Sequence, residues 1–510
     1  MRGRYERRIW QWNPGTYAPP RRRRACPYDA FVPDPIAGLE PELSGALAGI
    51  VSEAETAIAE LNRAARPELL PLARLLLRTE SIASSKLEGL QVETRMLARA
   101  EAKQEAGRSV GSEASEILAN IDAMQLAIER AVEADGISEA DLIDIHRLLM
   151  ARAPNAKTIA GRFREVQNWV GGNDYNPCGA DYVPPPPEEI RDLLADLCRF
   201  CDDEALPPLM QAAIAHAQFE TIHPFEDGNG RTGRALVQVI LRRRGLAPAF
   251  VPLISVVLAR DKERYIRGLG LFREGSIGEW VEIFASAAAQ SAMLARRYVA
   301  SVEVLQQRWR EQLRADSDPR ADAAVWDLIT VLPAHPIITV RVGVAATRRT
   351  KPAVSDGIDK LEAAGVLVRL SESLRNRSWE ATGLLDLIGQ LESGEWLAAE
   401  MASYTDDEGL VWPVYSQSKL RVGSRAVVEF ATTDTITVGD HMETAVPGLS
   451  EVVIRKVPTG YGTNFNLVVR VPSEEAIGER ETVLENARRR GGLAAGVPTN
   501  PLNRRESARG

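Results

Sequence analysis

The segment Ile222-His223-Pro224-Phe225-Glu226-Asp227-Gly228-Asn229-Gly230-Arg231-Thr232-Gly233-Arg234 decides how the fold around it is interpreted. Apolar helix patterns precede it and follow it. Pro224 disfavours a helical conformation at His223, so we expect the chain to turn there and a new helix to begin near Gly230. A helix N-terminus preceded by glycines presents free backbone N–H groups and the positive end of the helix dipole. The segment therefore predicts an anion-binding site.

The side chains of this segment predict phosphate chemistry. Arg231 and Arg234 are three residues apart, so both guanidinium groups lie on one helix face and can reach one anion. Asp227 offers a hard oxygen ligand, suited to Mg²⁺ that is held together with substrate phosphates. His223 titrates near neutral pH and can act as a general base. A base, a metal ligand and an anion cradle in one segment predict phosphoryl or nucleotidyl transfer.

The segment resembles the Fic family motif H-P-F-x-[D/E]-G-N-[G/K]-R-x-x-R and matches it at every fixed position. The resemblance extends over roughly residues 10–390 and includes 161–172 and 182–186, which are similar to the family's target-binding flap. It implies a protein adenylyltransferase, which transfers AMP from ATP to a Tyr, Ser or Thr hydroxyl of a target protein with the help of Mg²⁺.

The resemblance also implies roles for individual residues. His223 would be the catalytic base, and Asp227 would hold Mg²⁺. The nucleotide contacts would come from the glycine-rich turn, the helix after it and one later tyrosine, namely Gly228, Asn229, Gly230, Arg231, Thr232, Gly233, Arg234 and Tyr265. Many family members have two adjacent tyrosines near the adenine, whereas this chain has Tyr265-Ile266.

A second motif, Ser84-Ser85-Lys86-Leu87-Glu88-Gly89, resembles the family's inhibitory motif [S/T]-x-x-x-E-[G/N]. Ser84 and Glu88 are four residues apart and share one helix face. The resemblance implies that Glu88 pairs with Arg234 and blocks productive placement of the ATP γ-phosphate. Because the motif precedes the catalytic segment, the chain resembles the self-inhibited class II members.

The remaining sequence predicts a mainly α fold around this segment. Helical periodicity and good helix formers cover most of 36–135, 138–152, 188–222 and 228–315. The strand-like stretches 166–170 and 181–183 predict a β-hairpin flap. The first 24 residues, rich in aromatic and basic side chains, predict a surface arm. We expect an N-terminal region over 1–110 and a catalytic domain over 111–315.

Residues 316–392 predict a winged helix-turn-helix, from three short helices followed by two strands. Between 337 and 380 there are eight Lys or Arg residues against five acids, which favours phosphate contact with DNA. Three of the acids, Asp356, Asp359 and Glu362, lie on the expected recognition helix and oppose it. The residues leave DNA binding and a docking or dimerisation role equally open.

The end of the chain is the least informative part. Residues 393–490 predict a strand-rich region, and the Gly-, Asn- and Arg-rich residues 491–510 predict a disordered tail.

The amino-acid composition excludes several classes of protein. Of 510 residues, 45% are hydrophobic and 26% charged, which excludes wholesale disorder, and the net charge of −8 argues against a general nucleic-acid binder. Four cysteines are too few for a disulfide framework and suit a reducing cytoplasm. The longest charge-free apolar stretch, 246–259, is too short to span a membrane. We therefore expect a cytoplasmic protein, and leave a homodimer open.

Two alternatives to a self-inhibited adenylyltransferase remain. In one, the chain is a DNA-binding regulator whose Fic domain modifies itself or a partner. In the other, the Fic domain removes AMP or transfers a different phosphate-containing group.

Overall fold

The computed structural model describes residues 3–393, apart from 16, 64, 66–68, 70, 91, 106–108, 132–135 and 371–376, and only strand residues between 404 and 469. The chain forms two compact units, Met1–Gly394 and Glu395–Gly510. The boundaries expected after residues 110 and 315 fall inside the first unit and stay predictions. The predicted disordered tail, 491–510, lies outside the described residues.

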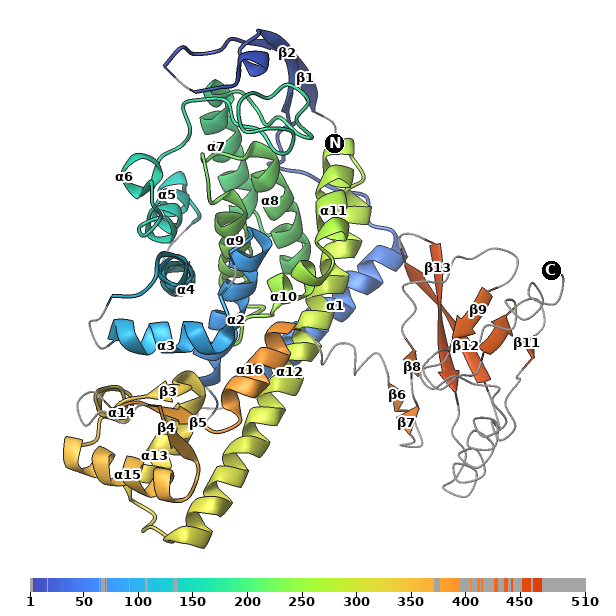
Figure 1. Ribbon diagram of the computed structural model, residues 1–510. Coiled ribbons are helices and arrows are strands. Elements are labelled where there is room, and N and C mark those ends of the chain that lie inside the picture. Colours follow the sequence, from blue (N-terminus) through green and yellow to red (C-terminus); the bar gives the residue numbers. More distant parts are fainter. Residues whose placement is uncertain are drawn as a thin grey trace, which may run out of the picture. The chain divides into compact units, whose positions relative to one another are not determined.

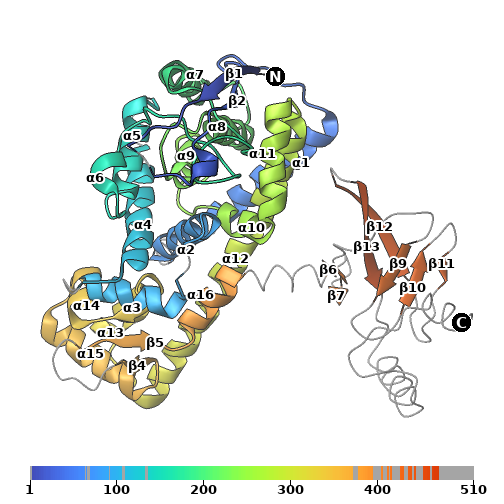
Figure 2. The same ribbon diagram turned by 45° about the horizontal axis from the view of Figure 1, so that its top comes forward.

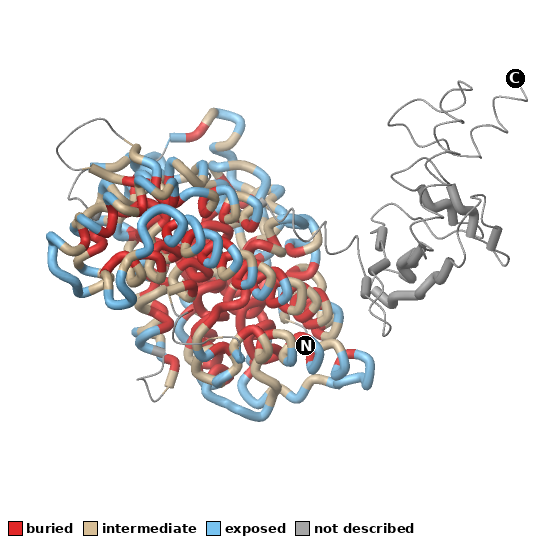
Figure 3. Tube along the Cα trace, turned by 90° about the horizontal axis from the view of Figure 1, so that it is seen from below, coloured by how far each residue is buried: buried red, intermediate tan, exposed pale blue. Residues whose placement is uncertain are grey.

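The first unit is mainly helical, as predicted (Figure 1). Helix α8 (Pro208–Ile222) lies in its core because alanines and other apolar residues occupy almost every side of the helix. In the tube view, buried residues concentrate in the interior of the first unit (Figure 3). The other helices before residue 317 are α1 (Gly45–Arg63), α2 (Pro71–Leu87), α3 (Thr94–Glu105), α4 (Ser112–Ala131), α5 (Glu139–Leu149), α6 (Ala156–Ile159), α7 (Ile190–Asp202), α9 (Asn229–Arg243), α10 (Ile254–Arg260), α11 (Lys262–Glu274) and α12 (Ile277–Asp316).

The N-terminal arm is a β-hairpin, which the sequence analysis missed. Strands β1 (Arg4–Trp10) and β2 (Cys26–Val32) pair antiparallel, with Arg4 opposite Val32 and Trp10 opposite Cys26. A disulfide joins Cys26 to Cys178, and the ring of Trp10 meets that of Trp169 edge-on at 5.4 Å. The disulfide was not predicted, and it ties the hairpin to the expected flap region.

The flap itself differs from the predicted β-hairpin. Only Val170 and Tyr182 pair, as an isolated bridge. Between them, the Asn173 side chain accepts hydrogen bonds from the backbone N–H groups of Tyr175 and Asn176, which favours a compact loop over a strand ladder. The proline run after Val183 has no N–H groups to donate, so a second strand cannot continue there.

The last part of the first unit packs against α3 and α12 (Figures 1 and 2). Its sheet has the strand order β3–β5–β4 and is antiparallel. Strand β3 was not predicted, and the winged-helix interpretation stays a prediction. The elements are α13 (Ala324–Val331), the 3-10 turn η4 (Leu332–Ala334), β3 (Ile337–Ile338), α14 (Val340–Thr347), α15 (Lys351–Ala363), β4 (Leu367–Arg369), β5 (Trp379–Ala381) and α16 (Leu384–Ser393).

The second unit is described only through its strands, which form small antiparallel sheets. They are β6 (Tyr404–Thr405), β7 (Val411–Trp412), β8 (Val414–Tyr415), β9 (Ala426–Glu429), β10 (Thr435–Val438), β11 (Met442–Glu443), β12 (Val452–Thr459) and β13 (Gly462–Val469). Strands β9 and β10 pair antiparallel. Across the described parts of both units, no helix combines the length and apolar character that a membrane span requires.

Candidate active site

The motif forms the sharp connection between α8 and α9. His223 ends α8 with a φ of 50°, in the left-handed region, and Gly228 precedes α9 with a φ of 78°. Helix α9 begins at Asn229, one residue before the predicted start. The free backbone N–H groups of its first turn therefore lie beside the histidine.

Phe225 and Asn229 fix the shape of the loop. Phe225 is fully buried and stacks on His146 of α5, with ring centroids 3.7 Å apart. The Asn229 amide accepts from the Phe225 N–H at 2.9 Å and donates to its carbonyl at 2.8 Å. Nδ1 of His146 accepts from Gly161 N–H, so its Nε2–H donates to the Asp227 carbonyl at 2.9 Å. Sequence reasoning missed His146 because no local motif distinguishes it within its helix.

The environment of His223 favours a neutral imidazole. Burial, with a smaller effect from Arg164, lowers the pKa of His223 to about 4. Its Nδ1 lies 3.3 Å from the Glu220 carbonyl, which favours a proton on Nδ1 and a free lone pair on Nε2. Nε of Arg164 donates to the His223 carbonyl at 2.8 Å and holds the loop from the flap side. Arg164 was also missed by the sequence analysis.

Arg231 is a buried cation that is only partly paired. Its Nη2 lies 3.5 Å from the sulfur of Met150 and forms a long ion pair with Asp227 Oδ1 at 3.7 Å. Nε and Nη1 have no hydrogen-bond partner among the described residues, although both atoms are buried. Unpaired buried guanidinium donors are costly, so they mark a position prepared for an anion.

Arg234 is paired with the segment that resembles the inhibitory motif. It donates to the Ser84 hydroxyl at 2.9 Å, the Ser84 carbonyl at 2.8 Å and Glu88 Oε1 at 2.7 Å. Burial alone would raise the pKa of Glu88, but Arg234 outweighs burial and the net pKa lies below its usual value. The structure thus brings Ser84, Glu88 and Arg234 together. Glu88 and Gly89 form the turn after α2, and Gly89 has a φ of 89°.

The Glu88 carboxylate also covers the first turn of α9. A side chain at Gly230 would collide with Glu88 Oε1, so only glycine leaves room for it there. Glu88 therefore occupies the position over the helix N-terminus that an anionic ligand would need.

Asp227 has an exposed carboxyl group at the mouth of the site. Its Oδ1 accepts from Gly228 N–H at 2.6 Å. Among the described residues, no cluster of three or more His, Cys, Asp or Glu side chains is arranged to hold a metal ion. A single accessible carboxylate fits Mg²⁺ that takes its other ligands from water and substrate phosphates.

The remaining predicted contacts face elsewhere. The Thr232 hydroxyl donates to the Gly228 carbonyl at 2.9 Å within the helix. Gly233 packs against α8, near Phe219 and Glu220. Tyr265 of α11 is buried, and its hydroxyl lies 2.8 Å from His216 Nε2. The sequence analysis did not single out His216.

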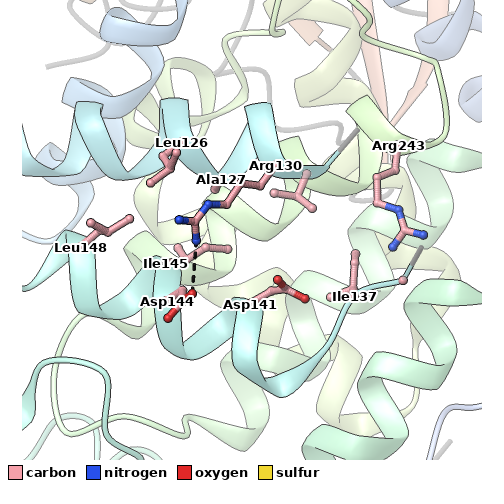
Figure 4. Close-up of a pocket in the computed structure, with 11 residues that line it drawn as sticks. Leu126, Ala127, Arg130, Ile137, Asp141, Asp144, Ile145, Leu148 and Arg243 are labelled. Carbon is pink, nitrogen blue, oxygen red and sulfur yellow. Dashed lines mark hydrogen bonds and ion pairs between the residues drawn. The ribbon is translucent and has the colours of Figure 1, made fainter. Parts of the chain in front are cut away.

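One described pocket lies at the far end of α9 and contains none of the motif residues (Figure 4). Its walls combine leucine and isoleucine side chains of α4 and α5 with a rim of Arg130, Asp141, Asp144 and Arg243. Arg130 is paired with Asp144 at 3.2 Å.

Comparison with known sequences agrees with this geometry. Residues 136–241 match the family described as "Fic/DOC family", and residues 49–129 match "Fic/DOC family N-terminal". This region belongs to the Fic/DOC family. The match covers α2, Glu88 directly after it, and the complete α8–α9 connection.

Curated relatives of this Fic region include "Protein adenylyltransferase fic-1" of Caenorhabditis elegans, which is 31% identical over 161 residues, 29% of this chain and 30% of that protein. "Protein adenylyltransferase Fic" of Drosophila erecta is 32% identical over 182 residues, 35% of this chain and 33% of that protein. The chain thus spans about a third of the length of these relatives. A crystal structure of a Fic family protein from Desulfovibrio desulfuricans aligns with 67% of this chain and 98% of its own, with 22% identity and a TM-score of 0.41.

Proposed function

We propose that the chain is a protein adenylyltransferase that transfers AMP from ATP to a Ser, Thr or Tyr hydroxyl of a target protein and is held inactive by Glu88. The observation that carries the proposal is the state of two buried arginines on α9. Arg231 has buried donors without partners, and Arg234 is occupied by a carboxylate of the same chain. A site that is built for phosphates and closed by its own acid supports a self-inhibited nucleotide enzyme.

The reaction follows from the residues around the loop. His223 Nε2 would accept the proton of the attacking hydroxyl, because its imidazole is neutral at physiological pH. The N–H groups at the start of α9 and Arg231 would stabilise charge that develops on the α-phosphate. Asp227 would hold Mg²⁺, which supplies charge neutralisation at the phosphates when bound. Arg234, once free of Glu88, would bind the γ-phosphate and orient the leaving pyrophosphate.

The target segment would bind beside the loop 165–187. Val170 and Tyr182 pair there, and the β1–β2 hairpin lies alongside it through the Cys26–Cys178 bond. A target strand that adds to this loop would bring its hydroxyl to His223. The identity of the target, a homodimer and the cytoplasmic compartment all stay predictions.

The test is incubation of the purified chain and its Glu88→Gly variant with ATP and a native lysate, followed by mass spectrometry of modified peptides. We expect AMP on hydroxyl side chains, with far more of it in the variant. Peptides that carry phosphate instead of AMP would favour a different transfer. Loss of pre-existing AMP from target proteins would favour the removal reaction.

A second candidate function, DNA binding by residues 337–380, is favoured by how the acids of α15 are paired. Asp356 pairs with Lys360 at 2.8 Å, and Asp359 lies 4.0 Å from Arg377. These pairs satisfy two of the acids that oppose phosphate contact. Exposed Arg348 and Lys351 then flank the α14–α15 turn, and exposed Arg341 lies in the first turn of α14. Arg375 and Glu372, which belong to the same predicted surface, lie outside the described residues.

A further inference from the structure

The β1–β2 hairpin precedes both family matches and continues the backbone pairing of the loop 165–187. Phe31 of β2 donates its N–H to the Val183 carbonyl at 2.9 Å. The residue before it, Tyr182, pairs with Val170 on the opposite side. The order across this layer is therefore β1, β2, the segment with Tyr182 and Val183, and then Val170. Since paired strands lie about 4.8 Å apart, β1 lies roughly 14 Å from Val170.

The outer edge of β1 is an unused strand edge. In an antiparallel pair, residues that bond across the pair alternate with residues whose backbone groups point outward. Phe31 donates away from β1, so its partner Tyr5 also points outward, and Arg7 and Ile9 follow by alternation. Ile9 lies opposite Pro27, which has no N–H, as this alternation requires. Within the described part of the chain, β1 pairs with no strand other than β2.

The side chains of the same three residues lie on one face of the hairpin, because side chains of a strand alternate between faces. Tyr5 is 72% exposed and Ile9 is 65% exposed. Arg7 between them is also exposed and forms no ion pair with described residues, although Asp29 lies opposite it on β2. The edge therefore presents an unpaired cation between two exposed apolar side chains.

These features fit an extended, acidic polypeptide. A row of free backbone N–H and C=O groups accepts another strand. Arg7 favours an acid on its face, and Tyr5 and Ile9 favour apolar residues on either side of it. Residues 3–24 contain seven arginines and one acid, so the surrounding charge also attracts an acidic segment. A second copy fits poorly, because antiparallel pairing of two β1 strands centred on Arg7 sets like charges opposite each other.

We propose that the outer edge of β1 is a docking site for an extended segment of the target protein, in which an acid lies opposite Arg7 between apolar residues. This segment is separate from the one that would carry the hydroxyl to His223 beside the loop 165–187. The inference rests on the proposed function and adds the chemistry of its substrate. A target held at both points binds at lower concentration, so docking lowers KM and leaves kcat unchanged.

The first test uses two labelled peptides in which threonine alternates with valine, glutamate and valine, or with valine, lysine and valine. Binding to the full chain is measured by fluorescence anisotropy without nucleotide, and the acidic peptide should bind more tightly. Arg7→Glu should weaken the acidic peptide about fivefold and strengthen the lysine peptide by a similar factor. Arg21→Glu, at another exposed arginine of the arm, should have much smaller effects. Equal effects of the two substitutions would overturn the proposal.

A second pair of variants tests strand addition. Ile9→Pro removes an N–H that points to solvent and is not used between β1 and β2, which is the position where an edge strand tolerates proline. It should weaken both peptides about tenfold, because the added strand loses a hydrogen bond and meets the proline ring. Ile9→Val keeps the N–H and should bind as the parent does. Unchanged binding by Ile9→Pro would overturn the proposal, and the charge swap at Arg7 tests the same edge without altering the backbone.

The last test separates docking from the proposed reaction. The acidic peptide is added to Glu88→Gly protein, native lysate and ATP labelled in the α-phosphate. It should reduce the label on lysate proteins by raising their apparent KM, and leave automodification unchanged. AMP transfer that the peptide does not inhibit would overturn only the docking site, whereas peptide binding without AMP transfer would overturn only the proposed reaction. A dimer, or binding of oligodeoxythymidine, that Ile9→Pro abolishes would overturn the choice of partner.

Discussion

The arginines of α9 and the basic residues around the α14–α15 turn are both cationic, but the first are buried and the second are exposed. Arg231 and Arg234 are each 3% exposed, and the structure either pairs them or leaves their donors prepared for an anion. Arg348 and Lys351 are exposed on a turn, where water satisfies them. A buried cation is selective for its ligand, because leaving it without a matching anion costs free energy. Exposure leaves it with long-range attraction that salt screens.

The largest expected effect concerns the base beside the buried arginines. His223→Ala in the Glu88→Gly chain should lower AMP transfer by about 10²–10⁴-fold, because the hydroxyl is no longer deprotonated. ATP affinity should stay unchanged, since the phosphate cradle is intact. Transfer rate and ATP binding are measured on the same preparations.

A matched control for this substitution is His335→Ala. His335 is also a buried histidine whose pKa burial lowers to about 4, but it lies near β3, outside the motif. Its loss should leave the transfer rate intact. If His223→Ala kept near-parental transfer, the role of His223 as base would be wrong.

The next effect concerns the ion pair that closes the cradle. Glu88→Gly should raise transfer, including automodification, by roughly 10- to 150-fold, because a hydrogen bond between charged groups contributes about 1.5–3 kcal/mol. Glu93→Gly, which removes an exposed acid just after the same motif, is the control and should change nothing. Equal rates for wild type and Glu88→Gly would refute self-inhibition while the catalytic assignment stands.

DNA binding by the exposed basic residues should weaken as the salt concentration rises, whereas the buried arginines of α9 should be little affected. If Arg341, Arg348 and Lys351 contact three phosphates, DNA affinity should fall roughly 40-fold for a fourfold rise in salt, measured by fluorescence anisotropy. Alanine at all three positions should flatten that dependence, whereas alanine at Arg21, Arg22 and Arg24 should not. Full-length protein with no salt-dependent DNA binding would support the docking role instead.

The smallest effect is a shift in the pH profile. A base must be neutral to accept a proton, and the neutral form of His223 dominates above a pKa of about 4. Transfer by Glu88→Gly should therefore remain near its maximum at pH 5.5, where an unperturbed histidine would keep only about a tenth of its activity. An acid limb centred near pH 6.5, with the fold intact by circular dichroism, would contradict the buried environment of His223.

The parts of the site that sequence alone predicted are those encoded within short segments. The turn at His223, the helix start after Gly228 and the facing of Ser84 and Glu88 each follow from local rules about proline, glycine and helix spacing. The mainly α fold followed from periodicity over long stretches.

The parts that were missed depend on contacts between distant segments. His146 supports the loop from α5, Arg164 from the flap region, and His216 reaches Tyr265 across 49 positions. No spacing in the sequence connects such pairs. The flap was expected to be a hairpin because strand propensity was counted without the competing turn that Asn173 forms. The β1–β2 hairpin was missed because β1 is mostly polar and basic.

The central claim is that this site transfers AMP from ATP and uses His223 as base. Glu88→Gly protein is incubated in parallel with ATP that carries the label in its α-phosphate and with ATP that carries it in its γ-phosphate. We predict that protein acquires label only from the α-phosphate, and that His223→Ala abolishes it. Label acquired from the γ-phosphate, or α-label that persists without His223, would contradict the account.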